Sequence, residues 1–525
     1  MSMMRRALVA AVLALAPLLS ASAAVAQSVL RVAMHADVRA IDPVFSTAYI
    51  TRNHGYMVFD TLFAMDANGE IKPQMVDRFE ASADGLTYTF TLRQGLVWHD
   101  GQPVTAEDCI ASIRRWGARD TLGQTVLGFV DTMTPAGPDS FTITLKEKTG
   151  LLIYALGKPS STVPFMMPKR LAETPPTVQI SEVVGSGPFV FRRDEWRPGN
   201  KAVYTRFDGY RPRAEPPSGL AGGKVARFDR IEWLVLADQQ QAVNALLAGE
   251  IDVLEAVPHD QAPLLEADRN IRMWNANPLG SQYSFRPNHL QKPFDDPRIR
   301  HVLWHALNQE DFLQATVGNP EFYSVCRSIF VCPSRLMTEA GMDGLLEGNA
   351  RRARELLKEA GYDGTPIVLL HATDVAALAN LAPVAKALLE RAGFVVDMQA
   401  MDWATLVSRL QKRDPANAGG WSAYASSWSA ADILDPVMTG FLNSRCERAM
   451  IGWPCDPEME RLRDSFARET DPARQKEIAA AVQLRAIAWT PLVPLGQRRD
   501  RMATRSNITG IVPAPVTVFW NMSRQ

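Results

Sequence analysis

The chain has 525 residues, of which 46% are hydrophobic and 22% charged, and its formal net charge is −1. These proportions are ordinary for a globular protein. Nothing in this balance points to nucleic acid or an anionic membrane surface as a partner. The length predicts two or three domains, because a domain typically has about 100–200 residues.

The first 27 residues have the order of a cleavable secretory signal peptide. Arg5 and Arg6 precede an uncharged apolar run, Ala7 to Leu19, and Ala24-Val25-Ala26 supplies small residues for cleavage. The run is too short to span a membrane, which takes about 20 residues. Removal of residues 1–26 is therefore predicted. No cysteine follows the cleavage site, so we expect an exported chain without a lipid anchor.

Four of the five cysteines form two close pairs, Cys326 with Cys332 and Cys446 with Cys455. In an oxidising compartment such pairs are candidate disulfides. A metal site is less favoured, because no His and no Cys-x-x-Cys motif accompanies either pair. The fifth cysteine, Cys109, is predicted to be a small buried apolar residue in a helix.

In the first half of the chain, strand and helix patterns predict mixed α/β structure with antiparallel strands. A Pro- and Gly-rich stretch, Tyr210 to Gly223, predicts an exposed loop. Thr105 and Asp108 form a predicted capping box at a helix start. The other elements expected here are strands at 29–34, 86–92, 141–145, 231–236 and 251–254, and helices at 49–62 and 239–247.

In the second half, strands and helices alternate in the manner of a parallel sheet with crossover helices. Apolar residues from Ile299 to Leu307 fall on one face of a helix. A long helix at about 457–489 is expected to break near 470–472, and 516–520 is strand-like. The other expected elements are helices at 350–360, 381–392 and 403–410 and strands at 367–371 and 394–398. Two α/β lobes favour a ligand cleft between them.

No catalytic motif is found, and no cofactor is predicted. The chain has no G-x-S-x-G and no H-E-x-x-H. His301 and His305 have the spacing of metal ligands on a helix, but no Glu lies between them, so ordinary structural histidines are favoured. Asp295-Asp296 is best explained as a helix N-cap.

Asp432 is the most suggestive acidic residue, because Trp421, Tyr424 and Trp428 lie close to it in the sequence. An aromatic-lined pocket with one carboxylate is suited to binding an amine. A solvated loop with packed Trp side chains explains the same spacing equally well.

Six motifs in the expected order resemble those of the extracytoplasmic solute-binding proteins of ABC importers, family 5, which include dipeptide-, oligopeptide- and nickel-binding receptors. They are LRQGLVWHDGQPVTAEDC from Leu92, GSGPF from Gly185, AVNALLAGEIDVL from Ala242, FDDPRIRHVLWHAL from Phe294, ELLKEAGY from Glu355 and SWSAADILDP from Ser427.

The resemblance implies a two-lobed α/β periplasmic binding protein fold with a hinge. The expected first lobe is 27–274 with an extra subdomain at about 56–182, the second lobe is 275–489, and 490–525 returns to the first lobe. It also implies a monomer that closes on its solute and docks on an inner-membrane permease. Without a lipid anchor, such a receptor is expected in a periplasm.

The resemblance also implies site residues. Asp432 matches the residue that pairs with a peptide's α-amino group, although the segment has one more residue before Asp-Pro than is usual. Backbone groups of Ser429 and Ala430, beside Trp428, match a strand that an extended peptide joins. The expected cleft walls are Tyr49 and the Asn277 to Phe285 segment, including Tyr283 and Phe285.

These observations favour a receptor for a peptide-like solute. One alternative is the same fold with a non-peptide solute, such as a metal chelate, a sugar or a modified amino acid. The other alternative, a secreted hydrolase, requires a nucleophile–base pair that the sequence does not offer.

Overall fold

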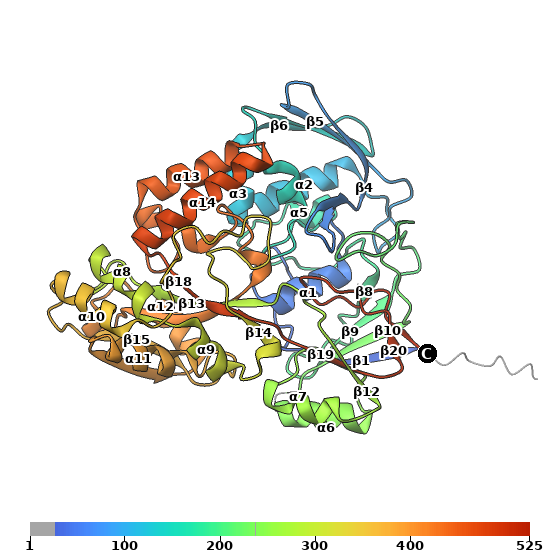
Figure 1. Ribbon diagram of the computed structural model, residues 1–525. Helices are drawn as coiled ribbons and strands as arrows, with labels where there is room; N and C mark the ends of the chain where they lie inside the picture. The colour runs from blue at the N-terminus through green and yellow to red at the C-terminus, as the bar shows by residue number, and fades with distance from the viewer. Residues whose placement is uncertain (1–26, 237) are drawn as a thin grey trace, which may run out of the picture.

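The computed structural model describes residues 27–236 and 238–525, so the predicted signal peptide lies outside the described part. In that part, no helix is both long and apolar enough to cross a membrane. Three sheets of four or more strands organise the described chain, and Figure 1 shows them in separate regions of the molecule.

A seven-stranded sheet contains the first strand of the described chain. β1 is parallel to β10 and β11, whereas β9, β8, β19 and β12 join antiparallel. Leu30 and Val32 of β1 are fully buried, as the strand pattern predicts. Across the sheet, the strands are β12 (Ile271–Trp274), β19 (Met502–Arg505), β11 (Val253–Leu254), β1 (Val29–Ala33), β10 (Arg230–Leu234), β9 (Lys201–Arg206) and β8 (Phe189–Phe191).

Helices cover this sheet on both sides. In Figure 1, α1 (Tyr49–Val58) lies above the sheet, and α6 (Gln239–Ala248) with α7 (Ala262–Glu266) lies below it. Helix α1 ends at Val58, earlier than the predicted Leu62, because Phe59 is already extended. Its residues from Ile50 onward are all buried, including the polar ones, so α1 is an interior helix.

A four-stranded antiparallel sheet and its helices form a second region. The predicted capping box is confirmed, because Thr105 and Asp108 exchange hydrogen bonds at the start of α2. Cys109 is buried and free on the same helix. The elements are β4 (Val76–Ala81), β5 (Thr87–Leu92), β7 (Ser140–Leu145), β6 (Val130–Pro135), α2 (Ala106–Arg119), α3 (Thr121–Phe129), α4 (Leu152–Leu156), α5 (Lys169–Ala172) and the hairpin of β2 (Phe63–Met65) and β3 (Ile71–Pro73).

The six-stranded sheet belongs to the second half of the chain. β15 is parallel to both β16 and β17, which confirms the predicted crossover arrangement, while β13 pairs antiparallel with β17 and β18. Its strands in order are β14 (Tyr323–Ser324), β18 (Val493–Arg498), β13 (Ser281–Pro287), β17 (Ala423–Ser429), β15 (Ile367–Ala372) and β16 (Val396–Met401). Its helices are α8 (Pro297–Ala306), α9 (Gln309–Thr316), α10 (Ala350–Glu359), α11 (Leu381–Arg391) and α12 (Trp403–Leu410).

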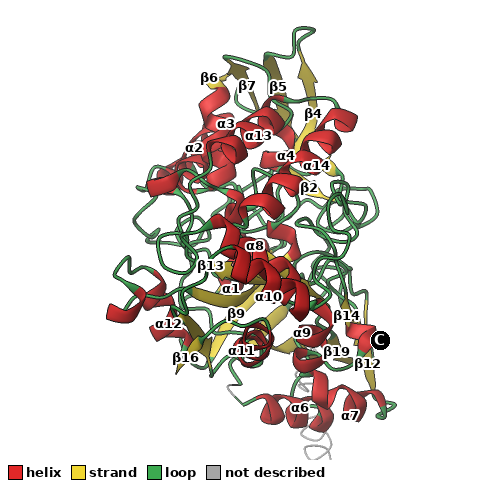
Figure 2. Cartoon of the chain, turned by 60° about the vertical axis from the view of Figure 1, so that its left-hand side comes forward, coloured by secondary structure: helices red, strands yellow, loops and turns green. Residues whose placement is uncertain are grey.

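Helices α13 (Pro457–Arg468) and α14 (Pro472–Trp489) contact the region of the four-stranded sheet. The predicted break between them is confirmed, because Asp471 caps α14 and Pro472 begins it. Figures 1 and 2 both place the pair beside α2 and α3. The Thr149 hydroxyl donates to the Ala467 carbonyl, and Arg468 pairs with Glu147 at 3.2 Å.

The last part of the chain crosses between two sheets. β18 lies in the six-stranded sheet and β19 in the seven-stranded sheet, so we propose that the return to the first lobe begins after Arg498 rather than at 490. The prediction of a strand at 516–520 was wrong, because these residues pack as buried loop between β20 (Ile508–Thr509) and β21 (Ser523–Arg524). Pro513 and Pro515 precede them, and each lacks the amide hydrogen that a sheet requires.

Both cysteine pairs are joined by disulfides. Cys326 is bonded to Cys332 and Cys446 to Cys455, with Cα–Cα distances of 5.7 and 4.1 Å. Each bond closes a short loop beside the six-stranded sheet. The second loop contains Ile451, whose carbonyl accepts a hydrogen bond from a buried arginine described below.

A buried ion pair connects the loop before α1 to helix α2. Arg115 donates to both oxygens of Asp42 at 3.1 and 2.7 Å, and both side chains are almost fully buried. Arg115 also donates to the carbonyls of Thr174 and Val178, so its charge has partners on several sides.

We expect Asp42→Asn to lower the free energy of unfolding by about 3 kcal/mol, because it leaves the buried Arg115 charge without its carboxylate. Urea unfolding followed by tryptophan fluorescence measures the change. The control is Asp77→Asn, which removes an exposed carboxylate 3.8 Å from Arg78 and should change stability by less than about 0.5 kcal/mol. Equal effects of the two variants would contradict this account.

Candidate functional site

The Tyr49 side chain connects helix α1 to the six-stranded sheet. Tyr49 is the first residue of α1, and its hydroxyl donates to Asp432 Oδ2 at 2.7 Å. The same hydroxyl accepts the backbone N–H of Ser429 at 3.0 Å. Ser429 ends β17, and Asp432 ends the following short helix η4 (Ala430–Asp432). The structure thus brings together three of the predicted site residues. Tyr49 comes from the half with the seven-stranded sheet, and Ser429 and Asp432 come from the half with the six-stranded sheet.

Asp432 is a buried carboxylate with one free oxygen. Its side chain is 3% exposed, and Oδ1 has no hydrogen-bond partner among the described residues. Burial raises the pKa of Asp432, an effect that the charges of Arg52 and Lys158 and the hydroxyl groups of Tyr49 and Ser160 partly offset. Burial likewise raises the pKa of Tyr49, so its hydroxyl keeps its proton. A cationic group is therefore the natural partner for the free oxygen.

A network of buried polar side chains supports Tyr49 within the first half of the chain. Arg52 lies over the Tyr49 ring, 4.6 Å from its centroid, and donates to the Ser160 hydroxyl at 2.6 Å. It also donates to Asn53, whose amide reaches Glu255 at 2.9 Å. The sequence analysis missed Arg52, whose one signal is a charge inside a helix that is otherwise buried.

One face of strands β13 and β17 carries several polar groups without partners. Residues directly opposite each other in an antiparallel pair share a face, and Gln282 faces Trp428 while Ser284 faces Ser426. Gln282 Nε2 and the hydroxyls of Ser284 and Ser426 are buried without a hydrogen bond in the described chain. Buried polar groups usually have partners, so this face is suited to a polar ligand or to water.

Arg286 shares this face, where Tyr424 lies opposite it. It too escaped the sequence analysis, although a charge within an apolar strand pattern is a signal that such a residue has a special role.

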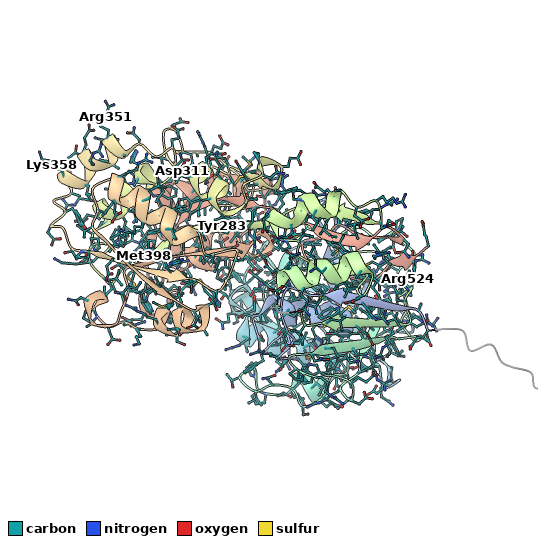
Figure 3. The ribbon with its side chains drawn as sticks, turned by 90° about the horizontal axis from the view of Figure 1, so that it is seen from below. Tyr283, Asp311, Arg351, Lys358, Met398 and Arg524 are labelled. Atoms are coloured by element: carbon teal, nitrogen blue, oxygen red, sulfur yellow. A yellow bond between two sulfur atoms is a disulfide. The ribbon has the colours of Figure 1, made fainter. Side chains whose placement is uncertain are left out.

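Tyr283 and Phe285, the predicted cleft-wall residues, lie on the opposite face of β13. The Phe285 ring packs against Phe294, with centroids 6.3 Å apart, and the Tyr283 ring lies under Arg498. In Figure 3, Tyr283 lies in the same half as Met398 and Asp311, on the side nearer the other half. The sequence predicted the correct strand, but side chains alternate along it, so an error of one residue selects the wrong face.

The aromatic residues expected around Asp432 do not form one cluster. Trp421 is fully buried, donates from Nε1 to the Leu410 carbonyl and packs edge-on against Tyr424. Trp428 packs edge-on against Phe441, with centroids 4.6 Å apart, and is partly exposed. Trp421 therefore contributes to the core of the second half, whereas Trp428 lies beside Ser429.

The backbone groups expected to bind a peptide already have partners. The Ser429 N–H bonds the Tyr49 hydroxyl, and the Ala430 N–H bonds the Gly280 carbonyl at 3.0 Å. A ligand that pairs with Ser429 must therefore displace Tyr49, and this role stays a prediction.

The two spaced histidines have no third ligand near them. The rings of His301 and His305 are 5.7 Å apart, and His301 Nδ1 lies 3.3 Å from the Ile487 carbonyl oxygen. Within residues 27–236 and 238–525, no group of three or more His, Cys, Asp or Glu side chains is arranged to hold a metal ion.

Comparisons with known proteins agree with this architecture. A family model described as bacterial extracellular solute-binding proteins, family 5, middle, matches residues 70–446. The chain is 38% identical over 518 residues to the probable peptide ABC transporter periplasmic-binding protein y4tO of Sinorhizobium fredii, covering 98% of this chain and 97% of the relative.

Solved structures have the same fold. A dipeptide-binding protein from Pseudoalteromonas sp. SM9913 in complex with Met-Leu matches with a TM-score of 0.78 and 18% identity, covering 95% of this chain and all of that one. AgaA from A. tumefaciens R10 in complex with agropinic acid matches with a TM-score of 0.75 and 21% identity, over 95% and 99% of the two chains. The family match spans most of the chain, and the chain belongs to family 5 of the bacterial extracellular solute-binding proteins.

Proposed function

We propose that the protein is a periplasmic receptor that binds a peptide-like solute between its two lobes and delivers it to an ABC permease. The observation that carries this proposal is the buried Asp432 carboxylate, which has one oxygen bonded to Tyr49 and the other without a partner. An α-amino group of the solute would bond the free oxygen. The name of the y4tO relative supports peptide as the class of solute.

The Tyr49 contact supports a closing mechanism. Its hydroxyl comes from the half that carries the seven-stranded sheet, and its two partners come from the half that carries the six-stranded sheet. Groups that meet only when the lobes close favour the closed state, and a solute that touches both lobes shifts the population further toward it. The permease then has a distinct closed shape to recognise.

A non-peptide solute is the main competing proposal. The AgaA structure was solved with agropinic acid, so this fold also accepts ligands that are not ordinary peptides. The hydrolase alternative has little support, because the chain belongs to a family of binding proteins.

The identity of the solute is directly testable. We expect native mass spectrometry of protein purified from its own periplasm, without unfolding, to detect a bound peptide or peptide-like molecule that is released on denaturation. A protein that has been unfolded, dialysed and refolded is the control and should carry no such mass. Recovery of a sugar or a metal chelate would overturn the peptide proposal.

We expect Asp432→Asn to weaken binding of a free-amine peptide about 10- to 100-fold, the effect of removing a charged partner from a buried hydrogen bond. Isothermal titration calorimetry with a peptide and its N-acetylated form measures the effect. The control is Asp397→Asn, an exposed change on β16 of the same sheet, which should bind like the wild type. If Asp432→Asn leaves the affinity for the free amine unchanged, Asp432 is not the amine-binding residue.

The raised pKa of Asp432 predicts a pH dependence. The carboxyl of the empty receptor is protonated at a higher pH than an exposed Asp, whose pKa is about 3.9, and the neutral form has no charge to attract an amine. We therefore expect the dissociation constant to rise as the pH is lowered through that raised pKa. Titrations from about pH 8 to 4 should show this rise in the wild type and a flatter profile in Asp432→Asn. Equal slopes would contradict the assignment.

A further inference from the structure

Arg286 is a buried cation without a counter-ion in the described chain. Its side chain is fully buried on β13, and it forms no salt bridge with any described residue. Nη2 donates to the Ile451 carbonyl at 2.6 Å, whereas Nε and Nη1 have no hydrogen-bond partner. Burial lowers the pKa of Arg286, and among the described residues only Tyr424 acts to raise it. A guanidinium in this position is costly unless an anion joins it.

The groups around Arg286 hold its guanidinium in one orientation. The guanidinium lies over the Phe441 ring, 4.4 Å from its centroid, and Phe441 in turn packs against Trp428. Gly452 has a φ of +99°, and a Cβ added there would lie 3.0 Å from the Pro287 carbonyl oxygen, so a glycine lets the loop pass close to β13 beside Arg286. The aromatic ring and the loop fix the plane of the guanidinium, which suits two-pronged binding of a carboxylate.

Other buried arginines in the described chain have more hydrogen-bond partners than Arg286. Arg300 is equally buried and lies 4.8 Å from the centre of the Trp489 ring. Yet it donates to the carbonyls of Trp489, Phe294 and Asp295. Arg300 is left with one unpaired nitrogen, Nη2, whereas Arg286 is left with two, Nε and Nη1. The similarly buried Arg115 is paired with the Asp42 carboxylate, so Arg286 lacks more of its usual partners than either of them.

We propose that Arg286 binds a carboxylate of the solute, at the opposite end of the β13–β17 face from Asp432. This inference rests on the proposed function, since it adds an anion-binding position to the same ligand site. Gln282, Ser284 and Ser426 lie between the two ends on the same face, and their free polar atoms are positioned to bond the solute between its charged groups.

The register of the strands sets the size of this solute. Ser281 lies opposite Ser429, next to η4, while Arg286 is five residues further along β13. At about 3.4 Å per residue, the two positions are about 17 Å apart along the strand. An extended dipeptide spans only about 7 Å. A solute that spans this whole distance is about five residues long, and because the Asp432 and Arg286 side chains can reach toward it, about three to five residues are enough.

The first test compares Arg286→Met with the wild type on matched probes: tri-, tetra- and penta-alanine, each as the free acid and as the C-terminal amide. We expect the wild type to bind the best free acid at least about tenfold more tightly than its amide, and Arg286→Met to lose this preference. A folded Arg300→Met variant is the matched control and should keep it. An acid preference that is unchanged in Arg286→Met would overturn the inference while leaving the peptide proposal intact.

The second test does not need a ligand. Because Arg286 is an uncompensated charge, we expect Arg286→Met to leave the urea midpoint of the solute-free protein unchanged or to raise it. Arg300→Met should lower the midpoint, because it leaves buried carbonyls without donors. A loss of stability in Arg286→Met as large as in Arg300→Met would mean a structural role and would overturn the inference. If the wild type binds none of the peptides, the proposed function fails, and this second test alone decides the role of Arg286.

Discussion

The hydrogen bond between the Tyr49 hydroxyl and the buried Asp432 carboxylate links the two halves of the molecule through a charge that is expensive to bury. Removing a carboxylate from water is unfavourable unless hydrogen bonds and opposite charges replace the lost hydration. Here Tyr49 supplies one hydrogen bond, and the positive charge of Arg52 lowers the cost of burying the carboxylate. One oxygen remains unpaired. The Asp432 carboxylate therefore has enough partners to be buried, and its unpaired oxygen is still able to accept a hydrogen bond from a ligand.

The face shared by β13 and β17 also combines buried polar atoms with missing hydrogen-bond partners. An apolar set of side chains there would pack better and would avoid the cost of polar atoms without partners. The opposite face of β13 follows that rule, since Phe285 packs on Phe294. A protein that must open and close around a solute gives up some stability on the face that meets the solute. One face of β13 thus packs the second half together, and we propose that the other face binds the solute.

The sequence predicted the parts of this structure that depend on local patterns. Strand alternation, the capping box at Thr105 and the break before Pro472 are all set by residues within a few positions of one another. Tyr49 and Asp432 were both predicted as site residues, but they are 383 positions apart, and no local pattern shows that they touch. The choice between Phe285 and Arg286 also depends on which face of a strand meets the other half, which only the packed sheet decides.

The second disulfide lies in the loop that contacts Arg286, and its formation depends on the compartment in which the protein folds. Its loop, from Cys446 to Cys455, contains Ile451, whose carbonyl accepts the one hydrogen bond that Arg286 makes with the described chain. A crosslinked loop has fewer conformations to lose when a ligand binds, so it presents this carbonyl in a fixed position at little entropic cost. Such a bond persists only where the surroundings are oxidising. Oxidising surroundings agree with the family of this chain, which is described as extracellular solute-binding proteins.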